Sequence, residues 1–151
     1  MASPVVHELA QINIARLAAP LDSPQLADFV AGLEPVNADA DAAEGFRWRL
    51  QSEGGDATDI QVFGDAWLIV NMSVWRDTEA LKAFMFAGQH LDALRRRREW
   101  FVPIAEAATA LWWVPAGHRP TVPEAEQRLV HLREHGPTPY AFTLRQSHPA
   151  T

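Results

Sequence analysis

The sequence contains no cysteine, which excludes disulfide-stabilised scaffolds, thiolate zinc sites, iron–sulfur clusters and cysteine nucleophiles. It also lacks the GxGxxG, P-loop and GxSxG motifs, so nothing supports a dinucleotide-binding, nucleotide-triphosphate-binding or serine-hydrolase protein. No apolar run approaches the roughly 18 residues of a membrane span. Residues 1–4 show neither the basic nor the apolar region of a signal peptide. We therefore expect a soluble, cytoplasmic protein without a membrane partner.

Basic residues are in the minority. Lys and Arg total 13 against 19 for Asp and Glu, giving a net charge of −6. A protein that binds phosphate backbones usually carries a basic field, so nucleic acid is not expected as a partner. The chain has 151 residues, of which 48% are hydrophobic, and it contains no internal repeat or linker. These values predict one domain over residues 1–151 with its own hydrophobic core.

Tyrosine is almost absent, with one residue, whereas tryptophan occurs six times. The aromatic surface is therefore mostly indole. Indoles fill large volumes in cores, but they also line pockets, and their N–H groups need partners when buried. Composition alone does not decide whether the six tryptophans lie in the core or line a pocket.

Hydrophobic periodicity divides the chain into strands and helices. Alternation predicts strands over residues 5–17, 46–50, 66–75, 108–114 and 140–144, with a possible hairpin extension over 59–63. Helical spacing predicts a helix that starts at Pro24 and ends or kinks at Pro35, with residues 37–44 forming a short helical piece or a loop. Further helices are predicted over 77–101, bent near Gly88, and over 123–135. This order predicts an α+β, ferredoxin-like βαββαβ fold, in which an antiparallel sheet carries helices on one face, followed by an added helix and strand.

The strand faces suggest where a ligand would bind. We expect the helices to cover the purely apolar faces, which include Ile12, Ile14 and Val70. The opposite face would then hold polar and aromatic residues: His7, Gln11, Asn13, Trp48, Trp67, Asn71, Ser73, Trp75 and Trp112. Such a face would invite association, so we expect a homodimer with an incompletely filled, Trp-lined cavity for a small hydrophobic molecule. The alternative is that these residues only pack an interface or lie under the C-terminal extension.

Five segments carry a resemblance to a known family: residues 7–13, 72–75, 90 with 95–101, 111–118 and 136–142. On these segments the chain resembles the domain of unknown function 3291 family of the dimeric α/β-barrel superfamily, over about residues 5–145. The family name supplies no activity. The superfamily includes antibiotic-biosynthesis monooxygenases, haem-degrading monooxygenases, muconolactone isomerase-like enzymes and polyketide cyclases.

The resemblance implies two readings of Asn13, Trp75 and His90. In a haem-degrading protein His90 would ligate iron, Trp75 would distort the porphyrin and Asn13 would bind oxygen. His90 follows Trp75 by fifteen residues, about one helical turn more than in those relatives. In a cofactor-independent monooxygenase the substrate anion itself reduces oxygen, and the protein excludes water and stabilises the anion. We favour the second reading, for an aromatic or polyketide-type substrate. An isomerase, a cyclase and a non-catalytic binding or dimerisation module remain open.

Other charged and histidine side chains are weaker candidates. Arg98 falls within an apolar helical stripe and Arg97 lies on the side of His90, so either could hold a substrate carboxylate. Snorkelling or ion pairing at the helix end is the more ordinary role. His118 in a loop could reach a pocket, or stabilise a turn. His131 and His135 lie four residues apart but lack an HExxH signature, so no metal site is expected.

Overall fold

Strand β1 (His7–Leu17) is central to the sheet. In the computed structural model, which describes residues 5–150, β1 pairs antiparallel with β3 (Leu68–Trp75) on one side and β5 (Thr109–Pro115) on the other. Strand β2 (Phe46–Arg49) adds to β3, which gives the order β2-β3-β1-β5. The two-residue strand β4 (Phe101–Val102) pairs with the last residues of β1. The chain therefore has the expected ferredoxin-like α+β fold with a five-stranded antiparallel sheet.

The helices follow the expected order with different boundaries. The short 3₁₀ helix η1 (Pro24–Leu26) leads into α1 (Ala27–Ala42), which continues through Pro35 rather than ending there. The helix expected over 77–101 is broken into α2 (Thr78–Met85), α3 (Gly88–Arg95) and α4 (Arg97–Trp100). Ala87 is extended and Gly88 has φ +50°, which a right-handed helix cannot accommodate. Helix α5 (Val122–His135) matches its prediction. None of the helices described is long and apolar enough to cross a membrane.

Two expected strands are not formed as predicted. Residues 59–63 lie in the long loop between β2 and β3. In place of a final strand over 140–144, a single antiparallel bridge joins Phe142 to Leu111 of β5.

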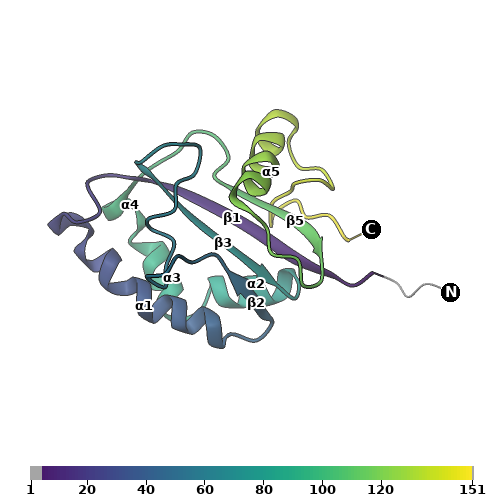
Figure 1. Ribbon diagram of the computed structural model, residues 1–151, viewed down its shortest axis with the longest axis horizontal. Coiled ribbons are helices and arrows are strands. Elements are labelled where there is room, and N and C mark those ends of the chain that lie inside the picture. The colour runs from purple at the N-terminus through teal and green to yellow at the C-terminus, as the bar shows by residue number, and fades with distance from the viewer. Residues whose placement is uncertain (1–4, 151) are drawn as a thin grey trace.

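Each face of the sheet is covered by a different set of elements (Figure 1). Helix α5 and the loop over residues 50–67 cover the purely apolar face. Ile12, Met72 and Trp112 are fully buried there against Leu129 of α5. Helices α1–α4 lie on the other side, over the face that carries Gln11, Ser73 and Trp75. The expected assignment of faces was therefore wrong, because the C-terminal helix takes the apolar face.

Trp48 and Trp112 were expected beside Trp75 but lie on the α5 face. For Trp48 the cause is a β-bulge. Phe46 pairs with Trp75 and Trp48 pairs with Val74, so the irregularity at Arg47 turns residues two apart in sequence to opposite faces. Trp113 is on the Trp75 side, packed against Phe142, so the two adjacent indoles of β5 point to opposite faces of the sheet.

Candidate functional site: an amide patch on the helix-covered face

Side-chain amides and hydroxyls occupy the middle of the face that α1–α4 cover. We call Gln11, Asn13, Asn71, Ser73 and Thr109 the amide patch. Gln11 of β1 donates from Nε2 to Asn71 Oδ1 (2.7 Å) and to Ser73 Oγ (2.8 Å), both on β3. The β1–β3 register places Gln11 opposite Ser73 and Asn13 opposite Asn71, which is why these side chains meet. The patch separates two hydrophobic clusters of this face, one around Trp75 and the other around Trp100.

Asn13 and Asn71 are the exposed members of the patch. Asn13 donates from Nδ2 to Thr109 Oγ1 of β5 (2.7 Å), so its carbonyl oxygen is left to accept. Asn71 accepts from Gln11 at Oδ1, so its amide N–H groups are left to donate. An acceptor and a donor therefore stand side by side on paired strand positions that a ligand can reach.

Trp75 is held rigidly beside the patch. Its Nε1 donates to Ser73 Oγ at 2.8 Å, and the side chain is 1% exposed. The ring makes an edge contact with Phe46 (5.5 Å between centroids) and stacks on Phe84 of α2 (5.1 Å). With both neighbours in place, the indole presents almost no surface to a ligand, and its role is to position Ser73.

His90 continues this aromatic series. Its ring lies 4.8 Å from that of Phe84, and Nδ1 lies 3.1 Å from the carbonyl oxygen of Met85. Burial lowers the pKa of His90 below its usual value, and the Met85 hydrogen bond opposes this only partly. At neutral pH the imidazole is therefore uncharged, with Nδ1–H donating to Met85 and Nε2 able to accept a proton.

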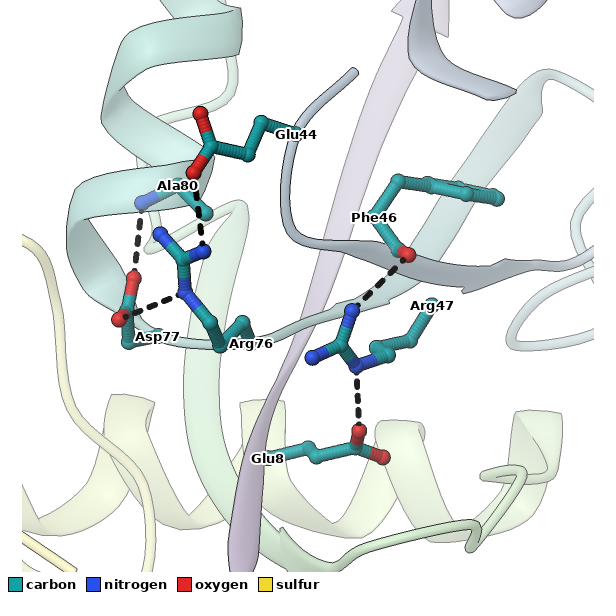
Figure 2. Close-up of polar contacts among 7 residues, drawn as sticks. All are labelled: Glu8, Glu44, Phe46, Arg47, Arg76, Asp77 and Ala80. Atoms are coloured by element: carbon teal, nitrogen blue, oxygen red, sulfur yellow. Dashed lines mark hydrogen bonds and ion pairs between the residues drawn. The ribbon is translucent and has the colours of Figure 1, made fainter. Parts of the chain in front are cut away.

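Polar contacts surround the start of helix α2, which carries Phe84, directly after β3 (Figure 2). Asp77 accepts from the Ala80 backbone N–H at 2.9 Å, a helix cap that, together with Arg76, lowers the pKa of Asp77. Arg76 pairs with Asp77 and with Glu44, each at 3.2 Å. In the same view Arg47 of β2 pairs with Glu8 of β1 at 2.7 Å.

Several candidate residues lie away from the patch. Trp112 donates to Glu124 of α5 (3.0 Å), and His118 binds the other oxygen of that carboxylate (2.7 Å). Trp67, directly before β3, is 49% exposed. On α4, Arg97 donates to the carbonyl of Leu94 and Arg98 is exposed, so neither contacts the amide patch.

The histidines of α5 have structural partners. His131 hydrogen-bonds Thr138 Oγ1 (2.8 Å) and packs against the ring of His135. Among residues 5–150, no three His, Cys, Asp or Glu side chains form a group that could hold a metal ion.

Sequence reasoning missed Thr109, Phe46 and Phe84 as neighbours of the candidate residues. The sequence could have predicted the position of Thr109, because the alternation along β5 places it on the same face as Leu111 and Trp113. It could not have predicted the position of Phe84, since only the break after Met85 decides how α2 and α3 lie on the sheet.

Comparison with solved structures shows the fold of the chain. A conserved protein from Methanosarcina mazei Go1 superposes with a TM-score of 0.51 at 9% identity, covering 73% of this chain and 93% of that one. A Pseudomonas aeruginosa protein superposes with a TM-score of 0.49 at 15% identity, covering 77% of this chain and 100% of that one. The oxygenase SnoaB of Streptomyces nogalater, described as cofactor-independent, superposes with a TM-score of 0.46 at 14% identity, covering 74% of this chain and 95% of that one.

Sequence comparison places the chain more narrowly. No curated protein is significantly similar to it. The model of the family described as domain of unknown function (DUF3291) matches residues 8–151, which is nearly the whole chain. The chain therefore belongs to the DUF3291 family.

Proposed function

We propose that the chain binds a small, largely hydrophobic molecule over the amide patch and acts on it as a cofactor-independent monooxygenase. The observation that carries this proposal is the exposed pair Asn13 and Asn71 on the two central strands of the sheet. Hydrophobic clusters flank the patch on both sides. A few placed polar groups within an apolar surround are the usual composition of a small-molecule site.

The proposed chemistry needs only the substrate and oxygen. An aromatic or polyketide-type substrate with an acidic CH₂ or phenol loses a proton, and the anion gives electrons to O₂. One oxygen atom becomes a carbonyl on the substrate and the other leaves as water, so the CH₂ group supplies all the electrons. Asn71 N–H groups would stabilise the anion, and the oxygen of Asn13 would accept from a neighbouring substrate hydroxyl. His90, which packs on Phe84 beside Trp75, would take the proton.

Oxygen uptake with a dihydroxyanthrone as substrate tests the proposal. We expect the protein to consume O₂ and anthrone in equal amounts and to form the anthraquinone faster than the heat-denatured protein does. Removing an anion-stabilising donor costs about a hundredfold in rate in other enzymes, so Asn71→Ala should approach the uncatalysed rate. Gln127→Ala removes an exposed amide from α5 and serves as the matched control. Equal rates for these two variants, or no catalysis over denatured protein, would reject the proposal.

Haem fits this site poorly. His90 has a free Nε2 that could ligate iron, but Trp75, the residue that would contact the porphyrin, is enclosed by Phe46 and Phe84. Titration with haem should give no Soret shift that depends on His90, as His90→Ala would reveal.

A further inference from the structure

A recess lies on the face of the sheet opposite the amide patch, near the C-terminal end of β1. Its floor is apolar and is formed by Ile14, Leu68 and Ile104, of which the first two belong to the core under α5. We call this recess the arginine pocket. Its volume is about 220 Å³. Pockets for drug-sized ligands measure about 300–1,000 Å³, so this one suits a smaller molecule.

Two arginines, Arg16 of β1 and Arg133 of α5, line the arginine pocket. Arg16 contacts Asp65 through Nη2 alone, at 3.3 Å. The other oxygen of Asp65 accepts from the Trp67 backbone N–H at 2.8 Å, so each carboxylate oxygen has a partner. Arg133 donates from Nε to the Ala107 carbonyl (2.8 Å) and pairs through Nη1 with Glu106, a second acid that lines the recess. Each guanidinium has five N–H donors, so unused donors outnumber unused acceptors around the recess.

Phe63 also lines the arginine pocket, and its backbone is unusual. It has φ +54° and is followed by Gly64 at +63°, a two-residue turn in which glycine or asparagine is the ordinary choice. Its N–H is bound by the carboxylate of Glu126, and its ring lies 5.5 Å from the Arg133 guanidinium. The side chain is still 37% exposed, so the core gains little from it. A strained, partly exposed aromatic residue beside two arginines suggests a role in binding.

We propose that the arginine pocket binds a small aromatic carboxylate. The carboxylate would accept from Arg16 and Arg133, while the ring would pack on the apolar floor against Phe63. An anion is favoured over a cation because both acids that line the pocket are already paired, Asp65 with Arg16 and the Trp67 N–H, and Glu106 with Arg133. This site is independent of the proposed oxygenase reaction, since Ile14 and Arg16 point to the face opposite Asn13.

Titration calorimetry with benzoate on the full chain tests the proposal, with benzamide as the uncharged ligand of the same shape. We expect saturable binding of benzoate at one site and binding of benzamide that is about tenfold weaker or more, as expected for loss of charge-assisted hydrogen bonds. Equal affinity for the two ligands, or no saturable binding of benzoate, would overturn the proposal.

Three variants localise the site. Arg16→Gln should weaken benzoate binding about tenfold. Phe63→Gly removes the ring and also relieves the positive φ, so it should weaken binding about threefold to tenfold without loss of folding. Arg76→Gln removes an arginine from ion pairs elsewhere and should bind as the wild type does.

Asn71→Ala separates this proposal from the oxygenase proposal, because it should leave benzoate binding unchanged. Benzoate binding that depends on Asn71 and not on Arg16 would overturn the arginine pocket as the site.

Discussion

Ser73 shows how a single hydroxyl can organise the site. It is buried, and its Oγ accepts from both Trp75 Nε1 and Gln11 Nε2. Gln11 in turn fixes the amide of Asn71. The orientation of an exposed, ligand-facing group therefore depends on a side chain that no ligand touches.

Ser73→Ala should lower the free energy of unfolding by about 1–3 kcal/mol, because it leaves the Trp75 N–H buried without an acceptor. Urea denaturation measures this loss. The double variant Ser73→Ala/Trp75→Phe should lose less than the sum of the two single changes, since the orphaned donor is then absent. Strict additivity would contradict the network.

His90 predicts a pH dependence of stability. Its pKa is lowered in the folded protein, chiefly by burial, so the unfolded chain binds the proton first as the pH falls. The contribution of neutral His90 is thus fully present above the unfolded pKa of about 6.5 and declines below it. Wild type should lose more stability than His90→Phe between pH 7.5 and about 5.5. Parallel unfolding curves for the two proteins across this range would rule out the effect.

At the scale of elements, the start of α2 gives a sharper pH test. The Asp77 carboxylate caps the helix, and its pKa is lowered foremost by the Ala80 N–H. Asp77→Ala should cost about 1 kcal/mol at neutral pH. Because the folded pKa is depressed, this stability is present above the usual value of about 3.9 and is lost as the pH falls further.

Thr121→Ala is the matched control for this test, because Thr121 caps α5 through a hydroxyl that does not ionise. The loss in free energy of unfolding caused by Thr121→Ala should not change with pH when urea unfolding is measured at acid pH. A cost for Asp77→Ala that is equally constant would show that the carboxylate charge is irrelevant to the cap.

The elements also show what the sequence can predict. Period two along β1 and β3 correctly separated Gln11, Asn13, Asn71, Ser73 and Trp75 from the apolar residues between them. The pattern could not say which helices cover which face, because periodicity records that a face is buried and not what buries it. The pattern placed Trp48 on the wrong face because the bulge at Arg47 inverts the alternation. No residue type in this segment signals the bulge.

Across the whole molecule, the chain itself covers most of both sheet faces and leaves Asn13 and Asn71 exposed. A homodimer was expected because an aromatic face would be uncovered, but α2 covers Trp75 on that face, so the homodimer stays a prediction without this support. The apolar face depends instead on α5, whose Ala125, Leu129 and Leu132 are buried in its core.

Leu129→Ala should therefore destabilise the protein by about 2–5 kcal/mol. Val130→Ala, on the outward side of the same helix and 38% exposed, should cost far less. Thermal unfolding followed by circular dichroism compares the two variants. Similar losses would mean that α5 contributes little to the core.

The position of β1 at the centre of the sheet has a consequence for folding during synthesis. This strand is synthesised before the strands that it pairs with, because the register joins Leu9 to Trp75 and to Trp113, residues made long afterwards. Contacts so distant in sequence slow folding. Until its partner strands are made, the nascent β1, which is apolar on one side, has both edges unpaired. Until β5 and α5 have been synthesised, a growing chain of this protein therefore exposes apolar residues of β1 that the folded protein buries.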